Sequence, residues 1–121
     1  MSTTHETLRI YHNPRCSKSR GACQILADKG LVPEVVEYLK TPLSRAELLA
    51  LLAALGMPAS ALVRQSEEIY KTEYKGRALS EDEWVDALLA HPVLMERPIV
   101  QRGSRAVVAR PPEALEQLFQ G

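Results

Sequence analysis

The chain has 121 residues, which is enough for one compact domain. Its fifteen basic residues balance fifteen acidic ones, so its bulk charge does not indicate nucleic acid or an anionic membrane as a partner. No apolar run approaches the roughly 20 residues that a membrane-spanning helix needs. The polar start, Met1 to Leu8, lacks a signal-peptide core, and we therefore expect a cytoplasmic protein whose two cysteines are free thiols.

The first third of the chain predicts a β-α-β unit. Residues Thr7–His12 alternate and indicate a short strand, which Asn13-Pro14 ends. Apolar residues recur at helical spacing over Ser17–Lys29, and Gly30 suits a C-terminal cap. The β-branched stretch Glu34–Leu39 predicts a second strand. A helix between two such strands predicts a right-handed parallel crossover.

The middle of the chain predicts helices. Ser44 with Glu47, and Ser80 with Glu83, have the spacing of a capping box. The second capped helix should stop at His91-Pro92. Other helical segments are expected to be shorter, and the one rich in polar residues is expected to be exposed. The expected segments are Ala46–Leu55, Met57–Arg64, Ser66–Tyr74 and Ser80–Ala90.

The last third returns to strands. Pro98–Gln101 and Ala106–Ala109 flank Arg102–Ser104, a good hairpin connection, and a closing helix is expected from Pro111 to Phe119. The order predicts one α/β domain over residues 1–121 with a thioredoxin-like layout: a small mixed sheet with a helical insertion at about 43–91. In that layout Arg97-Pro98 would take the cis-proline position.

Cys16 stands at the expected start of the first helix. Thiolate is the reactive form of cysteine, and helix N–H groups and nearby cations stabilise it. This placement favours a nucleophile, although a small buried apolar residue is the alternative. The possible donors and cations around it are His12, Arg15, Ser17, Lys18, Ser19 and Arg20, the last of which lies one turn along on the same helix face.

Cys23 is not expected to pair with Cys16. Seven helical residues separate the two, a rise of about 10 Å, whereas a disulfide needs Cα atoms within about 7 Å. Ser19 also stands where a Cys-x-x-Cys pair would have its second thiol. We therefore expect Cys23 in the core. If Cys16 carries out redox chemistry, its resolving thiol must come from another molecule, such as glutathione or a glutaredoxin.

Three arginines, Arg64, Arg97 and Arg110, are candidates for binding an oxyanion, because guanidinium forks match tetrahedral oxyanions. In a thioredoxin-like layout the loop before the third strand approaches the first helix, which brings Arg97 near Cys16. Sequence spacing does not place Arg64 or Arg110 near Cys16. For each of the three arginines, the alternative is a solvated charge on the surface. The residues alone thus indicate a thiol enzyme with an unknown partner.

Five blocks of the sequence resemble the glutaredoxin-linked arsenate reductase family: YHNPRCSKSR, EYLKTP, ALVRQSEEIY, HPVLMERPIV and ARPPE. The match is to the short proteobacterial branch with the NPRCSKSR loop. The resemblance implies a thioredoxin-like fold, a catalytic Cys16, a supporting His12 and an oxyanion clamp of Arg64, Arg97 and Arg110. It also implies reduction of arsenate to arsenite with glutathione as co-substrate and glutaredoxin as partner. No bound cofactor and no metal are expected.

One departure from the family and two other functions bear on this expectation. Members carried on resistance plasmids have Gly where this chain has Ser17. A redox-responsive regulator that binds RNA polymerase would use Cys-x-x-Cys, which Ser19 removes. A glutathione-dependent thiol reductase of other substrates would lack some of the three arginines.

Overall fold

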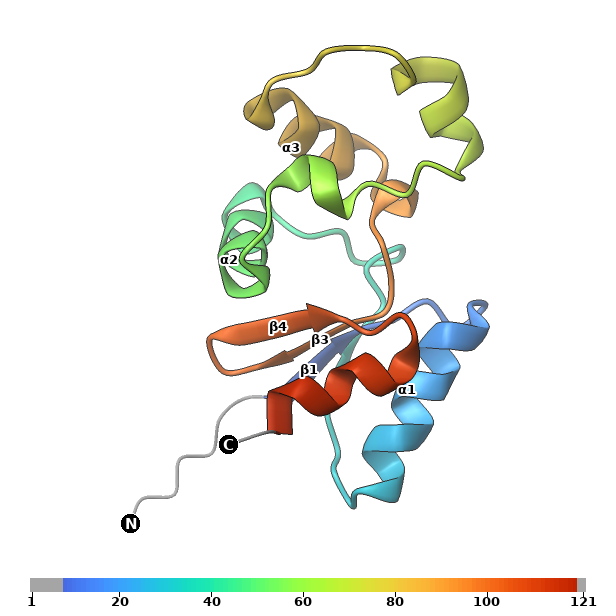
Figure 1. Cartoon of the computed structure of the whole chain (residues 1–121), viewed down its shortest axis with the longest axis vertical. Helices are drawn as coiled ribbons and strands as arrows, with labels where there is room; N and C mark the ends of the chain where they lie inside the picture. The colour runs from blue at the N-terminus through green and yellow to red at the C-terminus, as the bar shows by residue number, and fades with distance from the viewer. Residues whose placement is uncertain (1–7, 120–121) are drawn as a thin grey trace. The chain divides into compact units, whose positions relative to one another are not determined.

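The computed structural model describes residues 8–119, so Thr7, where the first predicted strand begins, lies outside the described residues, as do the ends of the predicted domain 1–121. The chain divides into two compact units (Figure 1). Unit 1 comprises the segment up to Tyr38 and the segment from Arg97 onward, and unit 2 comprises Leu39–Glu96. The predicted insertion at about 43–91 falls within unit 2.

Unit 1 contains a four-stranded mixed sheet in the order β2-β1-β3-β4. The β1–β2 pair is parallel, and the other two pairs are antiparallel. This confirms the predicted α/β, thioredoxin-like arrangement of a β-α-β and a β-β-α half. The strands are β1 (Leu8–Tyr11), β2 (Glu34–Val36), β3 (Ile99–Arg102) and β4 (Arg105–Val108).

The second strand is shorter than predicted. The β-branched run extends the pattern to Leu39, but only Glu34–Val36 pair with β1. The chain then turns and buries Tyr38, whose exposure is 1%. The hairpin between β3 and β4 is also tighter than predicted, because Arg102 pairs directly with Arg105 and Gly103 takes a φ of 60°.

Two helices pack on the sheet of unit 1 (Figure 1). They are α1 (Ser17–Asp28) and η4 (Pro112–Phe119), the second of which is a 3₁₀ helix. Each fully buried aliphatic side chain stabilises the unit by roughly 1.5–3 kcal/mol. This core holds α1 against β1, so the loop between them is anchored at both ends. The core residues are Ile10, Ala22, Leu26, Val100, Ala109, Leu115 and Leu118.

Unit 2 is helical, and both predicted capping boxes are present. Ser44 accepts from the N–H of Glu47, and Ser80 accepts from the N–H of Glu83. Gly56 ends the first capped helix in the left-handed region, with φ 68°. The elements are α2 (Arg45–Leu55), η1 (Ala59–Leu62), η2 (Tyr70–Tyr74), α3 (Glu81–Ala90) and η3 (Pro92–Leu94).

The η2 segment is helical and has no buried residue, as predicted, but it is a π-helix. Its two tyrosines are half-buried against α3. The rings of Tyr70 and Tyr74 lie 6.4 Å and 5.8 Å from that of Trp84. Aromatic packing of this kind adds about 0.5–1.5 kcal/mol per pair, which stabilises the contact of the two tyrosines with α3.

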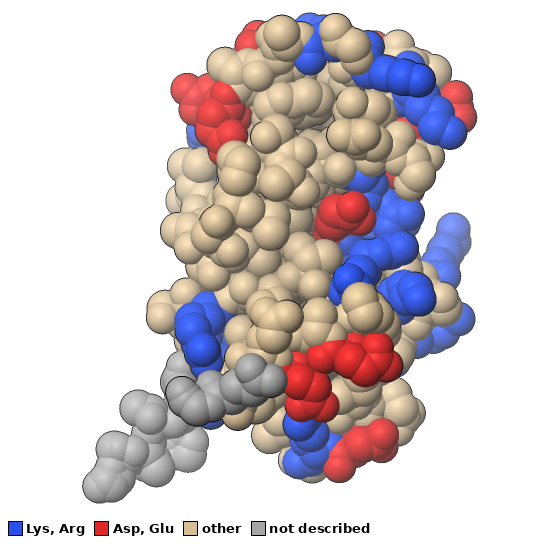
Figure 2. Space-filling model, in the orientation of Figure 1, with Lys and Arg blue, Asp and Glu red and all other residues tan. Residues whose placement is uncertain are grey.

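Figure 2 shows both acidic and basic side chains on the face that it presents. Within residues 8–119, no helix has the length and apolar character required to cross a bilayer.

Candidate active site around Cys16

The loop that carries Cys16 is folded around Asn13. Its side-chain oxygen accepts from the N–H of Arg15 at 3.0 Å, and its carbonyl accepts from the N–H of Cys16 at 2.9 Å. Its own N–H donates to the buried hydroxyl of Ser19 at 3.3 Å. These bonds tie the end of β1 to the first turn of α1. The Asn-Pro step predicts the end of the strand, and the structure adds an Asx turn, in which the Asn13 side chain accepts from the N–H of Arg15.

Cys16 is the N-cap residue of α1, with an extended backbone at φ −95° and ψ 124°. Its carbonyl accepts the first helical bond, from the N–H of Arg20 at 3.1 Å. The side chain is half-buried rather than enclosed in the core. An N-cap side chain lies beside helix N–H groups that have no partner within the helix. The thiol therefore occupies the part of the helix where a negative charge is most stable.

The pKa of the Cys16 thiol is lowered, although the largest single influence, burial, raises it. The backbone N–H groups of Ser19 and Lys18 are the largest influences that favour the thiolate, and together with the other donors they outweigh burial. The Ser19 hydroxyl and the Arg97 guanidinium favour it further. The donors and the helix start thus act together to favour the nucleophilic form of the sulfur.

Arg97 is brought to Cys16 across 81 positions of the sequence, as the fold analogy predicts. The residue is buried, with 8% exposure, and its peptide bond to Pro98 is cis. A buried guanidinium is retained only where it meets negative charge or acceptors. Its interaction with the sulfur is therefore a structural basis for an anion site beside Cys16.

Arg110 lies next to Arg97. Its Nη1 donates to the Arg97 carbonyl at 3.3 Å, and the residue itself is exposed. The Arg110-Pro111 peptide is also cis, which sequence analysis did not anticipate. The N–H of Ala109 donates to the carbonyl of Pro98 at 2.8 Å, which holds the two arginine-bearing loops together. Unit 1 by itself therefore combines the cysteine with two of the three predicted clamp arginines.

Arg64 belongs to unit 2, and its part in the clamp stays a prediction. Its side chain is 15% exposed. Its Nε lies 3.4 Å from a carboxylate oxygen of Glu67, and its Nη1 lies 3.7 Å from one of Glu96. Its backbone N–H donates to the carbonyl of Leu94 at 2.6 Å. The guanidinium is thus held by its own unit.

The supporting residues divide into those at the sulfur and those that hold the loop. Ser19 is buried and acts on the sulfur directly, whereas Ser17 is exposed. Arg20 lies one turn from Cys16, but its guanidinium donates to the Pro14 carbonyl at 2.9 Å. That carbonyl is a nearby acceptor, so Arg20 stabilises the loop.

His12 contacts the other cysteine. Its Nδ1 lies 3.7 Å from the sulfur of Cys23. Burial lowers the pKa of His12, with Arg20 acting in the same direction and Glu37 opposing it. Burial likewise raises the pKa of the Cys23 thiol, which packs against the core of unit 1. Both cysteines are free, as predicted.

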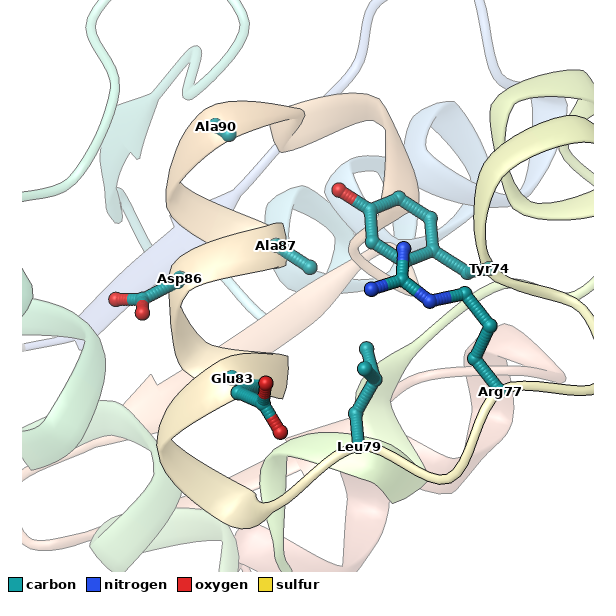
Figure 3. Close-up of a pocket in the computed structure, with 7 residues that line it drawn as sticks. All are labelled: Tyr74, Arg77, Leu79, Glu83, Asp86, Ala87 and Ala90. Atoms are coloured by element: carbon teal, nitrogen blue, oxygen red, sulfur yellow. The ribbon is translucent and has the colours of Figure 1, made fainter.

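A pocket of 280 Å³ lies in unit 2 and is drawn in Figure 3. Its charged groups already have partners within unit 2. Glu83 belongs to a capping box, Asp86 pairs with Arg45, and Arg77 donates to the carbonyl of Glu73. None of the predicted site residues lines it. The lining residues are Tyr74, Arg77, Leu79, Glu83, Asp86, Ala87 and Ala90.

No group of three His, Cys, Asp or Glu side chains within residues 8–119 is arranged to hold a metal ion. The fold and the site together define a thioredoxin-like protein with a low-pKa thiol at a helix N-terminus beside a buried guanidinium.

The chain belongs to the ArsC family, whose profile matches residues 11–118. It is 46% identical over 113 residues to the uncharacterized protein YfgD of Escherichia coli strain K12, covering 92% of this chain and 95% of YfgD. It is 40% identical over 114 residues to an arsenate reductase of Neisseria meningitidis, covering 93% and 97% of the two chains. The structure of an arsenate reductase from Vibrio cholerae matches with a TM-score of 0.89 and 40% identity, over 94% of this chain and 98% of that one.

Proposed function

We propose that the protein is an arsenate reductase that uses glutathione and glutaredoxin as reductants. The observation that carries this proposal is the thiol of Cys16, whose pKa is lowered at a helix N-terminus beside the buried Arg97. Relatives about 40% identical over most of the chain bear the name arsenate reductase, which supports the choice of oxyanion. In this proposal the protein acts in the cytoplasm, where thiols are kept reduced.

Binding of arsenate beside a thiolate must overcome the repulsion between two negative charges. In the proposed site Arg64, Arg97 and Arg110 offset that repulsion, together with the N–H groups at the start of α1. Arg97 is suited to this role because it already favours the thiolate of Cys16. The same donors hold the arsenic atom close to the sulfur, which makes the first step intramolecular in character.

The proposed reaction begins when the Cys16 thiolate attacks arsenic, forms an S–As bond and expels one oxygen as water or hydroxide. A glutathione thiolate then displaces a second oxygen, so that arsenic(V) carries two sulfur ligands. A glutaredoxin thiolate attacks the glutathione sulfur next, and the electron pair of that As–S bond passes to arsenic. Arsenic becomes As(III), and the two thiols leave as a mixed disulfide. Hydrolysis of the remaining S–As bond releases arsenite and returns Cys16.

The reducing thiols are proposed to come from other molecules because Cys23 is unsuited to the task. Burial raises the pKa of its thiol, and its sulfur faces His12. A resolving cysteine needs thiolate character and access to the bond it attacks. An external pair of thiols supplies the two electrons that reduce As(V) to As(III).

The test is a coupled assay with arsenate, glutathione and glutaredoxin, which compares the wild type with Cys16→Ser. The expected result is that the wild type forms arsenite and Cys16→Ser does not. A parallel assay replaces both reductants with thioredoxin and its reductase. If arsenite forms with thioredoxin and its reductase but not with glutathione and glutaredoxin, the proposed reductant is wrong. If no arsenite forms with either pair of reductants, the proposed activity is wrong.

A further inference from the structure

Two exposed cations flank Cys16 in unit 1, with Arg15 directly before it and Lys18 two positions after it. Among the described residues, neither side chain takes part in a hydrogen bond or an ion pair. By contrast, the ammonium group of Lys29, at the other end of α1, lies 2.7 Å from a carboxylate oxygen of Glu116. The two charges beside the thiol are therefore available to a ligand.

The main chain anchors these two cations beside the sulfur. The N–H of Arg15 donates to the side-chain oxygen of Asn13 at 3.0 Å, and the N–H of Cys16 donates to the Asn13 carbonyl at 2.9 Å. Lys18 lies in the first turn of α1, and its N–H is one of the groups that favour the Cys16 thiolate. Because consecutive Cα atoms are only about 3.8 Å apart, one flexible cation starts close to the thiol on each side of it along the chain.

Charge is distributed unequally along the chain, although the whole chain is balanced. Unit 1 contains nine basic and six acidic residues, and unit 2 contains six basic and nine acidic ones. No Asp or Glu occurs from His12 to Ala27, the segment that carries Cys16. Glu37 interacts with His12 at the edge of that segment, where burial and the charge of Arg20 outweigh its effect on the histidine pKa. The thiol thus stands in a locally basic segment, which favours a negatively charged second substrate.

We propose that Arg15 and Lys18 bind the two carboxylates of glutathione and thereby select it as the thiol that reacts at Cys16. Glutathione carries one carboxylate on its γ-glutamyl residue and one on its glycine, on either side of its cysteine. A cation on each side of Cys16 matches this arrangement when the two sulfurs meet. The inference rests on the proposed function through the role of glutathione as a reductant, and it adds the residues that recognise glutathione.

The test compares the reaction of Cys16 with oxidised glutathione, which is anionic, and with bis(2-hydroxyethyl) disulfide, which is neutral. It requires no arsenate. The Cys16 thiolate attacks one sulfur of the disulfide, a mixed disulfide with Cys16 forms, and the other sulfur leaves as a thiolate. The mass of the peptide that contains Cys16 identifies the adduct.

The quantity measured is the rate ratio, which is the rate with oxidised glutathione divided by the rate with the neutral disulfide. In the wild type this ratio is expected to fall about fivefold from low ionic strength to about 1 M salt, because salt screens charges that are exposed to solvent.

Arg15→Gln and Lys18→Gln each remove one charge and keep the backbone N–H groups that hold the loop and favour the thiolate. At low ionic strength each variant is expected to lower the rate ratio about threefold, and the double variant about tenfold. Lys29→Gln is the matched control, because it removes a charge from the other end of α1, where Lys29 pairs with Glu116. It should keep the wild-type ratio. Each glutamine variant next to the thiol is a test by itself, should the other fail to fold.

Three results would overturn the inference. Equal loss of rate with both disulfides in Arg15→Gln and Lys18→Gln would show that these cations act only on the pKa of Cys16. A wild-type ratio that salt does not change would show that charge does not select the thiol. A ratio that Lys29→Gln lowers as much as the other two variants would assign the preference to the overall charge of unit 1.

Failure of this inference is distinguishable from failure of the proposed function. If arsenite forms with thioredoxin but not with glutathione, the proposed reductant is wrong and the inference falls with it. If arsenite forms with glutathione while Arg15→Gln and Lys18→Gln keep the wild-type rate ratio, the assignment of these two cations alone is wrong. If no arsenite forms with either reductant, the reductase activity is wrong, whereas a ratio lowered by both variants still assigns Arg15 and Lys18 to recognition of glutathione.

Discussion

The two units obtain their structure in different ways. Unit 2 is one continuous segment whose helices start at capping boxes and end at local signals such as Gly56. Unit 1 is assembled from two segments separated by the whole of unit 2, and its sheet pairs β1 with β3. Local signals start and end the helices of unit 2, whereas the thiol site depends on a long-range strand pairing.

The two units also differ in whether their interactions act on the reactive thiol or only stabilise the fold. In unit 1 the groups at the sulfur belong to Lys18, Ser19 and Arg97, and each of them favours the thiolate form of Cys16. In unit 2 the only predicted site residue is Arg64, and the other interactions are caps, ring contacts and ion pairs. Substitutions in unit 1 should therefore alter reactivity, and most substitutions in unit 2 should alter stability alone.

The largest effect is expected from Cys16→Ser in unit 1. Loss of the nucleophile should reduce turnover about 10⁴-fold or more, the scale on which catalytic nucleophiles act. Steady-state arsenite formation is the measurement. Cys23→Ser, on the same helix, should retain turnover, because Cys23 packs against the core and takes no part in the proposed steps. A Cys23→Ser variant that folds but has lost turnover would contradict this division of roles.

Arg97→Ala should follow, with a loss of about 10²-fold in kcat/KM. The variant removes a buried guanidinium that favours the thiolate, so it should also raise the pKa of Cys16. Arg97→Lys keeps the charge but lacks the planar fork of the guanidinium, so its kcat/KM should lie between those of the wild type and Arg97→Ala. Unchanged kinetics in both variants would rule out the clamp.

Arg64→Ala sharpens the comparison, because Arg64 is the one member of the proposed clamp that belongs to unit 2. We expect KM for arsenate to rise about tenfold, the scale of one charge-assisted hydrogen bond. The pH dependence of Cys16 alkylation should stay as in the wild type, since Arg64 is not among the groups that act on the thiolate. A shift in that dependence would mean that Arg64 reaches the sulfur directly.

Ser19→Ala tests the electrostatics within unit 1. The variant should move the inflection of alkylation rate against pH upward, because the hydroxyl favours the thiolate. In the wild type the inflection should lie below the ordinary pKa of cysteine. Ser60→Ala, at an exposed position of unit 2, is the control and should leave it unchanged.

The lowered pKa of Cys16 also predicts that the stability of the protein depends on pH. A folded-state pKa below the unfolded one means that the folded protein binds fewer protons. This contribution to stability is complete above the unfolded pKa and is lost as pH falls through the folded pKa. Denaturation midpoints of the wild type and Cys16→Ser should therefore converge as the pH is lowered. A constant difference across that range would contradict the lowered pKa.

The smallest effect is expected in unit 2. Ser80→Ala removes the N-cap of α3 and should reduce the free energy of unfolding by about 1 kcal/mol. Alkylation of Cys16 should be unaffected. Ser66→Ala, which removes an exposed hydroxyl outside any cap, should change neither quantity. Altered Cys16 reactivity in Ser80→Ala would show that the two units do not divide the work as described.

Residues close in the sequence determined the parts of this protein that sequence analysis predicted well. The helix that starts after Cys16 and the boxes at Ser44 and Ser80 are set by side chains within a few positions of one another. The short reach of those bonds makes them readable from spacing. The resemblance of five sequence blocks to a known family added the role expected of Arg64, Arg97 and Arg110, which spacing could not supply and which stays a prediction.

Only the tertiary structure decided which long side chains reach the sulfur. Arg20 is four positions from Cys16 and turns back to Pro14, whereas Arg97 is 81 positions away and favours the thiolate. His12 likewise contacts Cys23. A guanidinium extends several ångströms from its backbone, so its partner depends on which acceptors the fold brings within that reach. The sequence therefore determined where the thiol stands, and the pairing of distant strands decided which charges surround it.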